Sequence, residues 1–203
     1  MTVTKIEAVS KTKYHVFLDN RFAFVLYKGE LSRYRLEEGM EIPETLYQEI
    51  KLTIVKRAKL RTMHLLNDMD RTEGQLREKL KVNGYTEDVI DEALEYVKSF
   101  GYVNDLNYAK RFIDHKKEKK SKKEIYALLC NKGLDKELIS QAMEEMYDRE
   151  DGKAAIKELL RKKKYCPDTA SDAEKQKIFA YLMRKGFAYE DVRQVIQVSG
   201  WNA

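Results

Sequence analysis

The chain has 203 residues, of which 43% are hydrophobic and 36% charged, with nine glycines and two prolines. This composition is typical of a well-solvated, helix-rich protein and excludes an intrinsically disordered chain. Its sequence has no apolar run near the roughly 18 residues that a membrane-spanning helix needs, and no signal-peptide core. We therefore expect a cytoplasmic protein with no membrane partner, in which the distant Cys130 and Cys166 stay reduced.

Residues 1–42 differ in kind from the rest of the chain. They contain three short runs rich in strand-forming residues, KIEAV, YHVFL and FAFVLY, and Asp19–Asn20 between the last two is typical of a two-residue hairpin turn. The stretch LSRYRLEEGM then leads into the first long helix. The sequence predicts a small antiparallel β-rich segment that packs on the first helical repeat, because so few strands are rarely stable alone.

After residue 42, one pattern occurs three times. Each copy has apolar residues at helical spacing on both sides of a glycine, which is Gly84, Gly133 or Gly186. Spacings of three and four predict one buried stripe on each helix, and glycine suits the left-handed residue at which the first helix stops. Thr86 and Asp135 are then placed to cap the second helix. Each copy is therefore a helix, a tight turn and a second helix.

Capping boxes begin the first helix of two copies. Thr72 with Gln75, and Ser121 with Glu124, have the spacing at which side chains satisfy the first N–H groups of a helix. The third copy has Glu174 at the equivalent position, so its cap must come from Ser171 or Asp172.

A further helix precedes each pair, at residues 44–68, 105–118 and 151–164, the first of them directly after Pro43. Small units of this kind bury enough surface only when neighbours stack. The predicted fold is mainly α, with three tandem three-helix repeats forming an elongated curved body. The predicted domains are the β-rich segment at 1–42 and repeats at 43–101, 102–150 and 151–203.

Motifs for catalysis or cofactor binding are absent from the sequence. It has no glycine-rich phosphate-binding motif, and His15, His64 and His115 are scattered without metal-ligand spacing. Asp68 and Asp70 fail the spacing of a calcium loop and are better explained by helix termination. We expect no cofactor, no metal and no enzymatic activity.

The formal net charge of +5 is concentrated in basic stretches. Such stretches attract polyanions or an acidic protein face, although a solvated lysine-rich helix end is the alternative. The candidate partner-binding residues in them are Arg57, Arg61, Lys116, Lys117, Lys119, Lys120, Lys122, Lys123, Arg161, Lys162, Lys163 and Lys164.

The motif RTEGQLREKL at 71–80, followed by GYTEDVIDEALEYVKSFGYVNDLNYAKRFI at 84–113, resembles the RecX family of bacterial recombination regulators. The resemblance covers about residues 54–198, and the β-rich segment is similar to the extension of the longer members. It implies a non-enzymatic protein that binds the RecA recombinase filament on single-stranded DNA. It also implies inhibition of ATP hydrolysis, strand exchange and co-protease activity, and thus a role in recombination and DNA repair.

Eleven positions match the family's pattern: Arg71, Thr72, Leu76, Arg77, Leu80, Gly84, Tyr85, Gly101, Tyr102, Asp105 and Tyr108. Most of them are explained as caps, turns and core. Arg71, Arg77 and Tyr102 are not, and we interpret them as further partner-binding residues.

The alternative is a helical-repeat module that binds single-stranded DNA or RNA directly. The turns NGYT and KGLD resemble those of helix-turn-helix proteins, and the lysines could contact phosphates. Against this, the helix after the first turn carries five carboxylates, at Glu87, Asp88, Asp91, Glu92 and Glu95, which would repel a phosphate-lined groove. We expect a monomer, because no heptad seam is visible.

Overall fold

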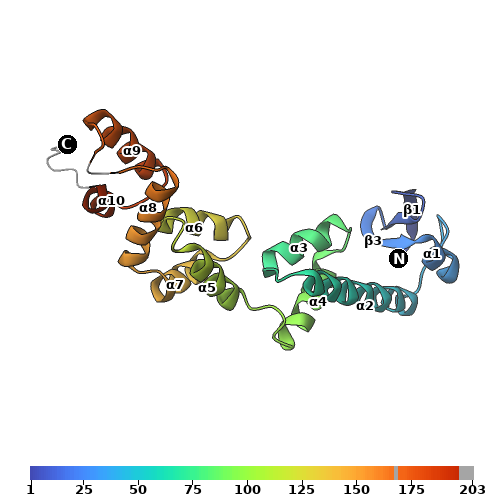
Figure 1. Cartoon of the computed structure of the whole chain (residues 1–203). Helices are drawn as coiled ribbons and strands as arrows, with labels where there is room; N and C mark the ends of the chain where they lie inside the picture. The colour runs from blue at the N-terminus through green and yellow to red at the C-terminus, as the bar shows by residue number, and fades with distance from the viewer. Residues whose placement is uncertain (167–168, 197–203) are drawn as a thin grey trace. The chain divides into compact units, whose positions relative to one another are not determined.

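The computed structural model describes residues 1–166 and 169–196 (Figure 1). The described part contains ten helices and one three-stranded antiparallel sheet, which confirms the mainly helical fold class with a small β-rich segment. The chain divides into two compact units, the first ending at Val103 and the second beginning at Asn104. None of the described helices combines the length and apolar character needed to cross a membrane. The predicted third repeat, 151–203, extends past residue 196 and thus beyond the described residues.

The sheet begins the first unit. Its strands are β1 (Val3–Ala8), β2 (Lys13–Leu18) and β3 (Arg21–Tyr27), paired in that order. Asp19 and Asn20 have φ of 48° and 63°, the left-handed values that a two-residue hairpin turn requires. The predicted hairpin is therefore confirmed. One sheet face is buried against the helices of the first unit through Val3, Val16, Leu18, Phe24 and Leu26.

The sequence analysis missed a helix directly after β3. Helix α1 (Lys28–Tyr34) occupies the start of the segment that was expected only to lead into the first long helix. Glu30 accepts a hydrogen bond from the Tyr27 amide at 2.7 Å and so satisfies an N–H group of its first turn. The helix ends at Arg35, whose φ of 50° is unusual for a residue other than glycine. Gly29 lies inside this helix and an arginine follows its last residue, so the sequence lacks the usual signals of a helix here.

Three helices complete the first unit: α2 (Glu44–Asp68), α3 (Glu73–Val82) and α4 (Glu87–Ser99). The bounds of α2 agree with the predicted 44–68. Its buried residues form one core cluster with those of α3, α4 and the sheet, among them Ile54, Leu80 and Ile90. The prediction that the strands pack on the first repeat is therefore confirmed.

The second unit contains six helices: α5 (Asp105–Lys116), α6 (Lys122–Cys130), α7 (Lys136–Met146), α8 (Arg149–Lys162), α9 (Asp172–Arg184) and α10 (Tyr189–Ile196). One core cluster contains buried residues of α5, α6 and α7, and a second contains buried residues of α8, α9 and α10. Helix α8 begins two residues before the predicted 151, because Asp148 caps it by accepting from the Asp151 amide at 2.9 Å.

Most of the predicted helix caps are present. Thr72 and Ser121 accept from the amides of Gln75 and Glu124, each at 3.1 Å. Helix α9 is capped by Ser171 and not by Asp172, since Ser171 forms the capping box with Glu174.

The two helices after the turns begin differently. Asp135 caps α7 by accepting from the amides of Glu137 and Leu138, as predicted. Thr86 stands at the start of α4, but its hydroxyl donates to the Asp88 carboxylate instead of capping the helix. The prediction of a side-chain cap at Thr86 is wrong.

The glycine turns confirm the conformational prediction and add a packing constraint. Gly84 has φ of +85°, and a Cβ atom built on it would lie 2.5 Å from Val25 Cγ2 of β3. Gly186 has φ of +84°, and its Cβ would lie 2.9 Å from Lys123 Cβ. Both turns therefore need glycine for backbone conformation and for close approach to a neighbouring element.

We expect Gly84→Ala to lower the free energy of unfolding by about 2 kcal/mol or more, through a strained φ and a clash with Val25. Gly29→Ala is the matched control, because its added methyl meets nothing within 4 Å and it lies inside α1. It should be neutral or slightly stabilising. Urea unfolding followed by circular dichroism measures both, and equal stability of the two variants would contradict the packing argument.

Candidate partner-binding surfaces

Arg57, a predicted partner-binding residue, lies inside the first unit. Its Nη1 is 2.5 Å from Glu30 Oε2, and its Nη2 donates to the Val25 carbonyl at 2.6 Å. Its guanidinium also lies 4.7 Å from the centre of the Tyr27 ring and 5.7 Å from that of Tyr85. One side chain on α2 therefore holds α1 and β3 in place, and a partner would have to displace all of these contacts to reach it.

Arg71 and Arg77 also have partners within the first unit. Arg71 Nε donates to the Leu65 carbonyl at 3.0 Å, near the end of α2, where carbonyls lack helical partners. Arg77 bridges α3 to α4 through Asp91 at 2.7 Å and Glu87 at 2.8 Å. Hydrogen bonds to Asp91 and Glu87 raise the pKa of Arg77. Arg71 and Arg77, which the sequence analysis could not explain as caps or core residues, thus have structural roles.

The carboxylates of α4 are less repulsive than the sequence analysis assumed. Asp88 is 2.6 Å from Lys51 Nζ, while Glu87 and Asp91 share Arg77. Burial alone would raise the pKa of Asp88, but hydrogen bonds from Lys51 and Thr86 outweigh it and lower the pKa. Three of the five carboxylates are therefore paired, and the electrostatic argument against nucleic-acid binding is weaker for this helix.

Tyr102 belongs to an exposed aromatic patch, formed by Tyr96, Phe100 and Tyr102 at the end of α4. The rings of Phe100 and Tyr102 stack with centroids 5.7 Å apart, and Tyr96 meets Phe100 edge-on at 5.0 Å. Phe100 and Tyr102 are 57% and 56% exposed. Lys59 Nζ lies 5.2 Å from the centre of the Tyr96 ring, and the predicted Arg61 is exposed on the same helix as Lys59. The sequence analysis identified Tyr102 and missed the two rings that adjoin it.

The lysine run at 116–123 separates into paired and unpaired residues. Lys117 lies 3.4 Å from Asp114 and 3.7 Å from Asp151, and Lys120 pairs with Glu124. By contrast, no ion pair to any described residue involves the remaining four, which are Lys116, Lys119, Lys122 and Lys123. The charge that remains available is thus smaller than the composition suggests.

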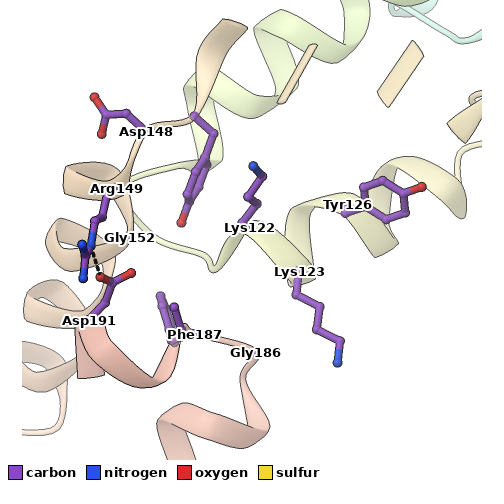
Figure 2. A pocket seen from close by; sticks show the side chains of 11 residues that line it. Lys122, Lys123, Tyr126, Asp148, Arg149, Gly152, Gly186, Phe187 and Asp191 are labelled. Atoms are coloured by element: carbon purple, nitrogen blue, oxygen red, sulfur yellow. Dashed lines mark hydrogen bonds and ion pairs between the residues drawn. The ribbon is translucent and has the colours of Figure 1, made fainter. Parts of the chain in front are cut away.

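Lys122 and Lys123 lie on a cleft in the second unit (Figure 2). The cleft has a volume of about 520 Å³. It is bordered by the first turns of α6, by residues 147–148 with the start of α8, and by the turn before α10 with the start of that helix. Phe187 and Tyr147 supply aromatic surface. In Figure 2 the lysines lie along α6, and the Arg149–Asp191 pair stands across from them. We call it the α6 cleft.

The interior of the α6 cleft is electrically balanced. Asp191 is 8% exposed, and its Oδ1 is 2.8 Å from Arg149 Nε. Burial, with a contribution from the Asp151 carboxylate, raises the pKa of Tyr147 to about 12, so its phenol is neutral. A Cβ on Gly152 would meet Asp191 and Tyr147 oxygens at 3.5 Å. Lys122 and Lys123 are therefore the unpaired cations of the cleft, and Asp148, a lining carboxylate that caps α8, offsets one of their two charges.

The Ser121 hydroxyl connects the two sides of this cleft. It accepts from the Glu124 amide and donates to the Lys185 carbonyl at 2.6 Å. Ser121 is fully buried and the Gly186 turn packs on Lys123. The start of α6 and the end of α9 are thus joined by one side chain.

The basic stretch at 161–164 lies elsewhere, since none of its residues lines the α6 cleft. Arg161 and Lys162 pair with Glu158 at 2.7 and 3.4 Å, and these contacts lower the pKa of Glu158 to about 2. Lys163 Nζ lies 4.3 Å from the centre of the Tyr181 ring, and Lys164 has φ of 53° just past the end of α8. Among the described residues, no group of three His, Cys, Asp or Glu side chains is placed to hold a metal.

Comparisons with known proteins identify the family. The models of the first and third three-helix domains of RecX match residues 58–96 and 150–196. A protein of Caldanaerobacter subterraneus subsp. tengcongensis named regulatory protein RecX is 34% identical, over 98% of this chain and its own full length. The chain belongs to the RecX family. A RecX regulatory protein of Clostridium beijerinckii is 30% identical, over 97% of this chain and 94% of its own length.

Solved RecX structures agree with this assignment. A crystal structure of regulatory protein RecX has a TM-score of 0.62 and 25% identity, covering 97% of this chain and 98% of its own. RecX from Lactobacillus salivarius, at 23% identity, has a TM-score of 0.60 and covers 72% of this chain and 96% of its own, and so supports the fold. The resemblance stated from the sequence is confirmed.

We expect Ser121→Ala to lower the free energy of unfolding by about 1–3 kcal/mol, because it removes a helix cap and a buried hydrogen bond together. Thr86→Ala, at the start of α4, should cost less than about 0.5 kcal/mol, since that hydroxyl caps nothing. Urea unfolding of both variants tests this, and equal losses would refute the double role of Ser121.

Proposed function

We propose that this RecX-family protein binds the RecA recombinase filament on single-stranded DNA and inhibits its ATP hydrolysis, strand exchange and co-protease activities. Membership of a family whose relatives are named regulatory proteins supports this. The observation that carries a partner-binding role is the α6 cleft, where Lys122 and Lys123 are unpaired beside aromatic surface. Cationic rims with aromatic interiors suit an acidic protein segment that also carries an apolar side chain.

The aromatic patch supplies a second anchor for a protein partner. Exposed tyrosine and phenylalanine rings are enriched among the residues that dominate interface energies, since they bury large areas with few rotatable bonds. Tyr102 and Phe100 are each more than half exposed, so part of their apolar surface is open to a partner.

The direct test is RecA ATP hydrolysis on single-stranded DNA, with the full chain titrated from below to above the RecA concentration. We expect inhibition when the concentration of this protein is well below that of RecA, because one molecule bound to a filament affects many RecA subunits. Unchanged hydrolysis at a large excess would refute it.

We expect Lys122→Glu/Lys123→Glu to raise the concentration for half-inhibition of that hydrolysis about tenfold, because reversed charge at an interface rim disfavours an acidic partner. The control Lys136→Glu/Lys157→Glu changes net charge equally at exposed positions on α7 and α8. It should inhibit like the unaltered protein. Equal loss in both variants would attribute the effect to net charge, and no loss in either would exclude the cleft.

Replacement of Tyr102 by alanine should raise the half-inhibiting concentration at least about fivefold, the effect expected of an interface anchor. Val82→Ala removes a more exposed apolar side chain, 85% exposed, from the same unit. It should leave inhibition unchanged. Thermal unfolding of both variants checks folding, and full inhibition by a folded Tyr102→Ala protein would exclude the patch.

Direct binding of single-stranded nucleic acid is a second candidate function. The unpaired lysines of the 116–123 run favour it, because each can neutralise one phosphate. Phosphate binding weakens steeply with salt and needs no RecA, whereas an interface built on aromatic anchors depends on salt less. A salt titration with DNA alone therefore separates the two functions.

A further inference from the structure

The N-terminal sheet has a second face that the helical core covers only in part. Cross-strand pairing places Lys5, Phe17 and Phe22 in one row on this face, and Glu7 and His15 in the next, which ends at the buried Val25 of β3. Lys13 and Tyr27 form a third row. These seven residues alternate with the buried residues of the opposite face, as a pleated sheet requires. We call this surface the open face.

Three rings form a cluster in the middle of the open face. Phe22 lies 6.0 Å from Phe17 and 5.1 Å from His15, and Phe17 lies 6.4 Å from His15, all measured between ring centroids. Each pair meets edge-to-face, and Phe22 is 41% exposed. One apolar ring is therefore exposed to solvent, and a second lies half-buried beside it on the neighbouring strand.

Cations accompany the rings. Lys5 Nζ lies 5.7 Å from the centre of the Phe17 ring, and Lys13 Nζ lies 5.8 Å from that of Tyr27. Glu7, the one carboxylate among the seven residues, is 3.1 Å from Lys5. The connection between β1 and β2 adds the exposed Lys11. The open face thus combines aromatic surface with an excess of positive charge.

Contacts with the helices hold one end of the open face in place. The Gly84 turn lies against Val25, which is 7% exposed, and Arg57 lies over Tyr27. This end is therefore partly covered, while Phe22 is exposed and His15 and Phe17 are half-buried. A surface supported in this way keeps its rings in position without a ligand, which lowers the entropy cost of binding.

The combination favours single-stranded nucleic acid over a protein segment. Unpaired bases stack on exposed rings of a sheet, and nearby lysines neutralise the phosphates between them. Protein anchors more often enter pockets, whereas the open face presents its rings on the surface of a sheet. We infer that the open face binds single-stranded nucleic acid, with bases stacking on Phe17 and Phe22 and phosphates contacting Lys5 and Lys13.

The test uses the full chain without RecA and a fluorescein-labelled oligothymidylate of about 20 nucleotides, followed by anisotropy at about 50 mM salt. Phe22→Ala should weaken binding at least about fivefold, the lower end of what one base–ring stack contributes. Tyr189→Ala is the matched control, because it removes a ring of nearly the same exposure, 40%, that meets Phe179 edge-on in the second unit. It should stay within about twofold of the unaltered protein.

A second pair of measurements tests the phosphate contacts. Lys5→Gln/Lys13→Gln should reduce the slope of log affinity against log salt by about 1.4, the value for two phosphates on a single strand. An unchanged slope, no binding by the unaltered protein, or equal losses in Phe22→Ala and Tyr189→Ala would each overturn the inference.

The inference can fail separately from the proposed function. Weaker oligonucleotide binding by Phe22→Ala with unaltered inhibition of RecA would support the open face as a separate nucleic-acid site. Loss of RecA inhibition in Phe22→Ala with unaltered oligonucleotide affinity would assign the open face to a protein partner and overturn the inference. Thermal unfolding of Phe22→Ala and Tyr189→Ala checks that each variant is folded.

Discussion

A left-handed glycine between two short helices is the constraint on which the repeats depend. Gly84, Gly133 and Gly186 have φ of 85°, 79° and 84°, and each lets one helix stop and the next begin within a few residues. Two of these turns also lie so close to a neighbour that a methyl group would clash, with β3 at Gly84 and with α6 at Gly186. The conformation that forms a repeat thus also forms the surface by which it packs on the adjoining segment.

The basic residues fall into two groups, those that make contacts within the fold and those whose charge remains unpaired. The local density of basic residues in the sequence does not predict the group. The arginines of the first unit that the family pattern singles out hold helices together, since Arg71 binds a carbonyl and Arg77 two carboxylates. The unpaired charge lies on lysines such as Lys122 and Lys123. Guanidinium groups suit several simultaneous contacts inside a fold, whereas a lysine at a rim stays hydrated and available.

Local signals predicted the helices, the glycine turns, the strands and most caps, because apolar spacing and capping residues act within a few positions of each other. Helix α1 escaped notice because its first-turn bond involves Tyr27 and its end is Arg35, neither a usual choice. The α6 cleft and the open face depend on residues far apart in sequence or on cross-strand register, whereas the rings of the aromatic patch lie within seven residues and could have been grouped from the sequence. Ion pairs such as Lys51–Asp88 are equally non-local, so the charge left available could not be counted from the sequence.

The two hydrogen bonds of Ser121 become possible at different times while the chain is being made. The Glu124 amide is three residues away, so the hydroxyl can cap α6 as soon as that helix leaves the ribosome. The Lys185 carbonyl is 64 residues further on, which corresponds to roughly 3–13 s of synthesis. The first helical turn of α6 can therefore form before its late partner exists. The last three helices then meet a docking point that is already ordered, and they lose less entropy in reaching their native place.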